Sequence, residues 1–340
     1  MSRQQEILRF IPPGTRGIEI APWHNPIVPA GGDRQAVALD ILDRAALVAR
    51  SETMPEIAPE MIAAISEVDL LGSACDIVEL AAARFGPETP FDFVVSSHNL
   101  EHLPDPVRFL RGCEAVLMPG GIVSMAVPDK RACFDFFRPH NNTGDWLQAF
   151  HERRERPAYS QAFAQLAYSA ALHEGAAVSA AFSINDKPDH IGLTGDVVQA
   201  YATWRDWIDR GDDQYHDVHC WTFTPASLEL MLTELALLGL LNLDIVEVTA
   251  PSGFEFYVHL RKPLADPPDR TGLAERRRLL LHRTADELAY CSSLAWGSRA
   301  DPEHRANAGD RNHVPGSHPR SLLRRIRRRI RRQFGWNVRG

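Results

Sequence analysis

The stretch from Phe91 to Asp129 constrains the fold more than any other part of the chain. It begins with the apolar run FDFVVSSH and ends with the apolar run GIVSMAVPD, each typical of a buried strand. Between them, Asp105 and Pro106 are suited to cap and start a helix, and the Pro-Gly-Gly of residues 119–121 is suited to stop it. Strand, helix and strand in this order predict a parallel sheet with right-handed crossovers.

Further strand signals lie on both sides of this unit. GIEI, AVALDI and the weaker VDLL precede it, and LDIVEVTA and FEFYVHLRK follow much later. Only Pro251-Ser252-Gly253 separates the last two runs, so they are expected to pair antiparallel. The predicted fold class is therefore α/β: a Rossmann-like, doubly wound and mostly parallel sheet with a C-terminal antiparallel hairpin.

The strand and helix rhythm breaks after Asp129, where long amphipathic stretches occur without a strand signal. This segment is predicted to be a helical insertion on the substrate side of the sheet. The predicted organisation is a core of residues 1–130 and 221–263, the helical insertion 131–220, a helical extension 264–296, a flexible linker 297–318 and a basic amphipathic tail 319–340.

Composition narrows the class of protein. A chain of 340 residues with 44% apolar content is long enough and apolar enough to bury a large core. Its five cysteines are scattered, odd in number and without a C-x-x-C pair, which favours neither a disulfide framework nor a zinc cage. The N-terminus has no signal-peptide core, and no window reaches the roughly 18 apolar residues of a membrane span. A cytoplasmic location is the expectation.

The order of these elements resembles the class I S-adenosylmethionine-dependent methyltransferases over about residues 15–262. The run from Phe91 to Asp129, with Leu-Glu-His-Leu, Asp-Pro and Pro-Gly-Gly between its strands, carries the resemblance. It is similar to a bacterial subgroup whose fifth strand ends in Pro-Asp-Lys-Arg and whose glycine loop reads about G-x-E-x-G-P-x-x-N-P. The resemblance implies S-adenosylmethionine as the cofactor.

The first predicted strand and its loop, GIEIAPWHNP, then correspond to the cofactor-binding loop of that family. Most members place glycines there so that the backbone can approach the methionine part of the cofactor. Here Ala21, Trp23 and Asn25 take those places, and alanine is expected to fit only if its φ is negative. The loop is thus either a cofactor site that has lost its glycines or a vestige of one. The cofactor residues assigned to it are Gly17, Glu19, Ala21, Pro22 and Asn25.

The rest of the predicted cofactor site follows from strand order, because ligands of open parallel sheets bind outside the carboxyl ends of the strands. Asp40, or Asp43 as the alternative, would accept hydrogen bonds from the ribose hydroxyls; a helix cap is the other reading of Asp40. Asp76 could accept the adenine amine. Ser97 and His98 would lie under the reacting sulfonium, with Glu19 in a less direct role toward the methionine amine.

Histidines supply the candidate catalytic groups. His98 and His102 are four residues apart, and a histidine with an ordinary pKa can serve as a base at neutral pH; a structural role for the Glu-His pair is the alternative. The spacing of His216 and His219 is also found in some metal sites. Because no spacing links the two pairs, no metal is expected.

The segment PDKRACFDFFRP packs charged and aromatic side chains at the rim of the predicted cleft. Its arginines indicate a wall for an anionic or polyhydroxylated acceptor; a salt-bridged hinge is the alternative. The substrate residues assigned are Asp129, Lys130, Arg131, Arg138 and His219. The resemblance to the methyltransferases implies O-methylation of a polar, glycan-like or lipid-linked acceptor as the activity. The alternative is a non-catalytic scaffold with the methyltransferase fold, and a dinucleotide dehydrogenase is disfavoured because G-x-G-x-x-G is missing.

The tail from Pro319 onward has a different charge from the rest of the chain. It holds nine of the chain's 37 Lys and Arg residues and none of its 44 Asp and Glu, so residues 1–318 have a net charge of −16. An apolar residue recurs every fourth position along it: Leu322, Ile326, Ile330 and Phe334. This stripe favours a helix lying on an anionic membrane, peripheral to its inner face, over nucleic-acid binding or a disordered extension.

Overall fold

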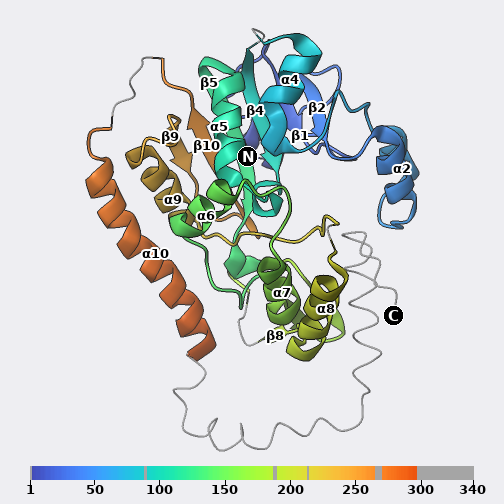
Figure 1. Ribbon diagram of the computed structural model, residues 1–340, viewed down its shortest axis with the longest axis vertical. Coiled ribbons are helices and arrows are strands. Elements are labelled where there is room, and N and C mark those ends of the chain that lie inside the picture. Colours follow the sequence, from blue (N-terminus) through green and yellow to red (C-terminus); the bar gives the residue numbers. More distant parts are fainter. Residues whose placement is uncertain (1, 88–89, 187–189, 213, 265–269, 297–340) are drawn as a thin grey trace, which may run out of the picture.

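A seven-stranded sheet in the order β3-β2-β1-β4-β5-β10-β9 forms the centre of the computed structural model (Figure 1). The residues described are 2–87, 90–186, 190–212, 214–264 and 270–296. The strands of this sheet are β1 (Arg16–Ile20), β2 (Gln35–Asp40), β3 (Leu70–Leu71), β4 (Phe91–Ser97), β5 (Leu117–Pro128), β9 (Asp244–Val248) and β10 (Glu255–Arg261).

The strand pairing confirms the predicted fold class. β1 runs parallel to both β2 and β4, and β4 runs parallel to β5. Only β10 is antiparallel to its neighbours β5 and β9, as the short turn between β9 and β10 predicted. All parallel strands therefore end at one edge of the sheet, next to the start of β10.

Helices pack on both faces of this sheet, with α5 and α9 on one face and α1 on the other. The helices of the described residues are α1 (Arg3–Ile7), α2 (Arg44–Glu52), α3 (Pro59–Ala63), α4 (Ile77–Phe85), α5 (Pro106–Val116), α6 (Thr143–Glu152), α7 (Tyr159–Tyr168), α8 (Val197–Arg210), α9 (Pro225–Leu237) and α10 (Leu273–Trp296), with short 3-10 turns η1 (Ala74–Asp76), η2 (Leu100–His102) and η3 (Lys130–Ala132). The side chain of Asp105 caps α5 as predicted, accepting from the Arg108 N–H at 3.0 Å. The helix ends at Val116, however, before the Pro-Gly-Gly motif is reached. The motif lies within β5 and does not form the helix stop.

The core is divided by the sheet, because side chains of a strand alternate between its two faces. Val94 belongs to the larger cluster, which includes the buried faces of α5 and α9. Phe93 and Val95 point to the opposite face, where Ile7 of α1 and Ile27 of the loop after β1 cover them. The loop after β1 is thus part of the core as well as a neighbour of the strand ends.

The inserted segment 131–220 departs from the expectation of helices alone. It contains α6, α7 and α8, but also a three-stranded antiparallel sheet of β6 (Ala170–Glu174), β7 (Ala177–Ser179) and β8 (Ile191–Leu193). These strands are short and rich in alanine, so no alternating pattern marks them in the sequence. Tertiary packing stabilises them instead: Leu172 packs with Phe136 and Phe182 in a small core of its own.

The helix α10 lies within the predicted helical extension and packs along α9 (Figure 1). Arg276 and Arg283 both pair with Glu229 of α9, at 2.9 and 3.2 Å. Within the described part of the chain, none of the helices combines the length and apolar character needed to cross a membrane. The predicted linker 297–318 and the tail 319–340 lie outside the described residues.

Candidate active site

The loop after β1 is organised by one buried carboxylate. Glu19 is 2% exposed, and its two oxygens accept the backbone N–H groups of Ile27 at 2.5 Å and Val28 at 2.9 Å. Burial raises the pKa of Glu19 to about 7, although the two N–H donors oppose that shift. Glu19 therefore holds the loop in place from within, a more structural part than the sequence predicted.

The replaced glycines of this loop keep a left-handed backbone. Ala21 has a φ of +50° and Trp23 a φ of +41°. The expectation that alanine would need a negative φ was therefore wrong, whereas Asn25 is not among the residues with positive φ. The indole N–H of Trp23 donates to Ser51 Oγ at 2.8 Å, and the Arg50 guanidinium lies 4.9 Å from the ring centre. These contacts offset the cost of about 1–2 kcal/mol for a left-handed L-residue.

Gly17 has a packing role that the sequence did not reveal. A Cβ added there would lie 2.3 Å from the ring of Phe93 on β4. Gly17 pairs with Phe93 in the sheet, so its lack of a side chain lets the two strands meet. It is not part of the cavity at the strand ends.

Two aspartates near the end of β2 have separate environments. Asp43 caps α2 by accepting from the Ala46 N–H at 2.8 Å. Asp40 ends β2, is 7% exposed and accepts from the Leu42 N–H at 3.0 Å. Burial raises its pKa, and the Leu42 N–H opposes the shift. The cap role thus belongs to Asp43, which favours Asp40 for the ribose.

Asp76 is engaged elsewhere. It lies in η1 and forms an ion pair with Arg108 near the start of α5. Neither residue lines the cavity at the strand ends. An adenine contact by Asp76 would have to compete with this ion pair.

A cavity of about 520 Å³ opens at the carboxyl ends of β1, β4 and β5. Glu19, Ala21, Pro22, Trp23 and Asn25 line one side of it. The facing side is lined by Ser97, His98, His102, Cys133, Phe134, His219 and Phe254, and Arg3 of α1 and Ala181 of the insertion complete it. The structure thus brings most of the predicted cofactor residues together with three histidines.

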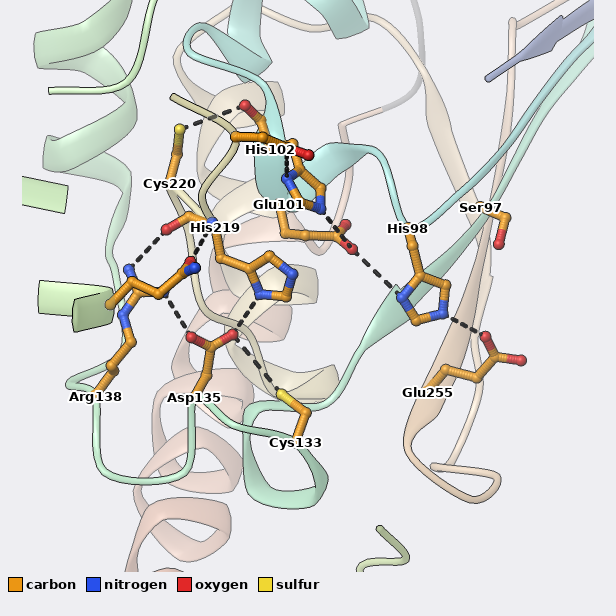
Figure 2. A network of polar contacts seen from close by, with 12 residues as sticks. Ser97, His98, Glu101, His102, Cys133, Asp135, Arg138, His219, Cys220 and Glu255 are labelled. Atoms are coloured by element: carbon orange, nitrogen blue, oxygen red, sulfur yellow. Dashed lines mark hydrogen bonds and ion pairs between the residues drawn. The ribbon is translucent and has the colours of Figure 1, made fainter. Parts of the chain in front are cut away.

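His98 is held between two carboxylates (Figure 2). Its Nε2 lies 2.8 Å from Glu255, and its Nδ1 lies 3.4 Å from Glu101. Burial by itself would lower the pKa of His98, but the two carboxylates outweigh it and raise the pKa to about 9. His98 is therefore protonated at neutral pH, which argues against the predicted role of general base. Its φ of +51° aims the ring at this pair.

His102 and His219 come from distant parts of the chain and meet edge to face, with ring centres 4.7 Å apart. The Nδ1 of His219 lies 2.5 Å from Asp135, and the Nδ1 of His102 lies 2.9 Å from Asp217. Burial alone would lower the pKa of His102, but the Asp217 carboxylate outweighs it and the pKa is raised. The sequence had no spacing that linked these two histidines.

The predicted substrate wall after β5 is instead an internal ion-pair network. Arg131 binds both carboxylate oxygens of Asp129, and Arg138 binds Asp135 at 2.6 Å and the His219 carbonyl at 2.8 Å. Both arginines are under 10% exposed, and neither lines the cavity. Lys130 is also buried and donates to the Phe136 carbonyl. Of the five predicted substrate residues, only His219 reaches the cavity.

The sequence indicated no role for several carboxylates of this site. Glu255 lies in the predicted strand FEFYVHLRK, and Asp217 lies between His216 and His219. Glu101 is fully buried next to His98 and His102. His216, by contrast, does not join the cluster: it stacks on Trp207 with ring centres 3.9 Å apart. The sequence signal that could have identified Glu101 is its position directly before His102.

A family model described as a methyltransferase domain matches residues 30–125. The chain is 34% identical over 71 residues to a ubiquinone biosynthesis O-methyltransferase of Pseudomonas paraeruginosa and to that of Pseudomonas aeruginosa. The match covers 20% of this chain and 30% of each relative, so the chain spans less than a third of the curated relatives it matches.

Solved structures of S-adenosylmethionine-dependent methyltransferases are also similar to the chain. One from Aquifex aeolicus has a TM-score of 0.36 at 10% identity and covers 76% of this chain and 89% of its own. One from Methanosarcina mazei has a TM-score of 0.35 at 14% identity, covering 76% and 98%. Overlaps this low carry no argument about the reaction.

Proposed function

We propose that the chain is a class I S-adenosylmethionine-dependent methyltransferase and that it transfers a methyl group from this cofactor to a hydroxyl of a small-molecule acceptor; the methyltransferase-domain match over residues 30–125 and the strand order of the sheet support the proposal. The observation that carries the proposal is the cavity at the strand ends, which the β1 loop bounds on one side and three histidines bound on the other. Such a cavity can hold a methyl donor and an acceptor against each other, and positioning supplies most of the catalysis in a displacement of this kind.

The residues around the cavity fit the cofactor. The left-handed backbone at Ala21 and Trp23 is the conformation for which the family uses glycine. Asp40 does not line the cavity, but it ends the neighbouring strand as a buried acid suited to a pair of ribose hydroxyls. Ala21 to Asn25 would hold the methionine part, and Ser97 and His98 would lie near the sulfonium. The cofactor, when bound, supplies an electrophilic methyl group on a cationic sulfur.

The acceptor is proposed to approach from the side of His102 and His219. Methylation of a hydroxyl requires removal of its proton, and these two imidazoles lie at the cavity while the protonated His98 does not offer a base. The name of the curated relatives, O-methyltransferase, supports an oxygen acceptor. We propose a polar acceptor of glycan-like or lipid-linked type. The histidines and Phe134 support it because they line the cavity, whereas Arg131 and Arg138 do not.

Calorimetry with S-adenosylmethionine and with its demethylated product tests the cofactor part. We expect micromolar binding of both. Absence of binding at millimolar ligand would overturn the proposal and favour the scaffold reading. Transfer of labelled methyl groups to a panel of polyhydroxylated and quinol-type acceptors then identifies the acceptor class.

The tail 319–340 is proposed to tether the enzyme to an anionic membrane surface, at the inner face of the membrane. Its support is the nine arginines with an apolar stripe between them. Co-sedimentation with anionic vesicles should retain the full chain and release a chain ending at His318. Equal partitioning of both chains would contradict the tether. RNA binding that is unaffected by Ile326→Ser and Ile330→Ser, without vesicle binding, would favour nucleic acid instead.

A further inference from the structure

We propose that Glu101, His102 and His219 bind a divalent transition-metal ion, of which zinc is the best fit, at the edge of the active-site cavity. One ligand atom from each residue lies within 4.8 Å of the other two. Two imidazoles and one carboxylate form a ligand set known from catalytic zinc sites, where the fourth position stays open. His102 and His219 both line the cavity, so the open position would face it.

The two histidines are oriented as metal ligands. A histidine that binds a metal through one ring nitrogen usually donates its other N–H to a carboxylate. The Nδ1 of His219 has such a partner, Asp135 at 2.5 Å, and the Nδ1 of His102 lies 2.9 Å from Asp217 in an ion pair without hydrogen-bond geometry. Their Nε2 atoms are therefore the ones available for a metal, and that of His102 lies 4.0 Å from Glu101 Oε1.

Glu101 provides an independent observation. Its side chain is 0% exposed, and neither carboxylate oxygen has a hydrogen-bond partner among the described residues. A buried carboxylate without hydrogen bonds is costly unless a positive charge compensates it. The protonated His98, whose Nδ1 lies 3.4 Å from Glu101, compensates part of this charge but lies too far for a good hydrogen bond. A metal ion between Glu101 and the two imidazoles would satisfy the carboxylate.

The backbone fixes the two ligand-bearing segments to each other. The Glu101 carbonyl accepts the N–H of Cys220 at 2.6 Å and that of Trp221 at 3.2 Å. The Trp221 indole also donates to the Leu103 carbonyl at 2.5 Å. The segment that follows His219 is thus joined to the backbone on both sides of His102, which is the pre-organisation a metal site needs.

The spacing and the ligand type favour zinc over magnesium. In a tetrahedral zinc site the ligand atoms lie about 2.1 Å from the ion and therefore about 3.4 Å from one another. The three ligand atoms here lie within 4.8 Å of one another, so side-chain rotations that shorten these separations by about 1 Å would complete the site. Imidazole ligands suit zinc, whereas magnesium prefers oxygen ligands.

The ion would deepen the proposed function, and this consequence rests on that function. In the open position it would bind the acceptor oxygen and lower the pKa of the hydroxyl, whose proton would then pass to solvent water instead of to a histidine. Metal binding itself does not depend on the transferase proposal.

The test uses the full chain, stripped of metal with a chelator and titrated with cobalt(II), whose visible absorption reports bound nitrogen ligands. We expect one cobalt per chain, displaced by zinc. Glu101→Gln, His219→Gln and His102→Gln should each weaken binding by more than about tenfold. His216→Gln is the matched control from the same segment and should bind as the unaltered chain does.

Absence of a cobalt spectrum in the unaltered chain overturns the proposal, as does binding that His102→Gln and His219→Gln both leave unchanged. His102→Gln keeps the test decisive if the buried His219 is required for folding, which circular dichroism reports. Calorimetry with the demethylated cofactor is run on the same samples. Cobalt binding without cofactor binding would support the metal site and overturn the transferase proposal. Cofactor binding without cobalt binding would support the transferase proposal and overturn the metal site.

Discussion

The loop after β1 and the segments around Asp135 and His219, called the charged wall below, both contribute residues to the lining of one cavity, and they are built by different means. The loop is shaped by its backbone, through left-handed residues at Ala21 and Trp23 and the N–H groups that Glu19 accepts. The charged wall is shaped by buried ion pairs, in which Asp135 contacts both Arg138 and His219. The loop therefore depends on its backbone conformation and on the Glu19 carboxylate, and the charged wall depends on each member of its ion pairs.

The largest difference should appear when a partner is removed from the charged wall. Asp135→Ala leaves Arg138 buried without its carboxylate, and we expect the free energy of unfolding to fall by about 3–5 kcal/mol. Asp206→Ala is the control, because Asp206 pairs with Arg210 on an exposed helix face and should cost under about 1 kcal/mol. Urea denaturation of both variants measures the contrast. Equal losses of unfolding free energy in the two variants would mean that the buried ion pair stabilises the fold no more than the exposed one.

The β1 loop should instead respond to pH through its one carboxylate. Glu19 has a folded pKa of about 7, above the ordinary 4.5. A raised acid pKa adds stability below pH 4.5 that is lost as pH rises through 7, an effect of about 3 kcal/mol. Glu19→Gln should remove this pH-dependent loss. The free energy of unfolding of the variant should therefore rise relative to that of the unaltered chain between about pH 5 and about pH 8. Parallel pH profiles of unfolding would contradict the assignment.

Cofactor binding separates the two aspartates near the loop. Asp40→Ala should weaken binding of S-adenosylmethionine by about 1.5–3 kcal/mol, the range for charge-assisted hydrogen bonds. Asp43→Ala should leave affinity unchanged while costing about 1 kcal/mol of stability, because Asp43 caps α2. Calorimetry and thermal unfolding distinguish the two effects. Unchanged affinity in Asp40→Ala would exclude the ribose role.

The smallest expected effect tests the backbone strain directly. Ala21→Gly should raise the free energy of unfolding by about 1 kcal/mol, because glycine adopts a φ of +50° without cost. Ala49→Gly, on the exposed face of α2, should lower it by about the same amount. Changes of the same sign in both variants would show that Ala21 is not strained.

The sequence by itself determined the sheet, because strand and helix periodicity and turn residues act over short distances. The mostly parallel strands, the final hairpin and the Asp105 cap follow from such local signals. The β1 loop also followed from them, since residues at the carboxyl ends of parallel strands share one edge. Its positive φ values did not, because only the closed loop imposes them.

Only the tertiary structure decided the charged wall and the short strands of the insertion. Whether Arg131 and Arg138 face a ligand or a neighbouring carboxylate depends on which groups are buried beside them, and sequence spacing does not contain that. His102 and His219 are 117 positions apart in the numbering, yet backbone hydrogen bonds from Cys220 and Trp221 to Glu101 bring their rings together. Long-range burial, rather than local pattern, therefore set the chemistry of this side of the cavity.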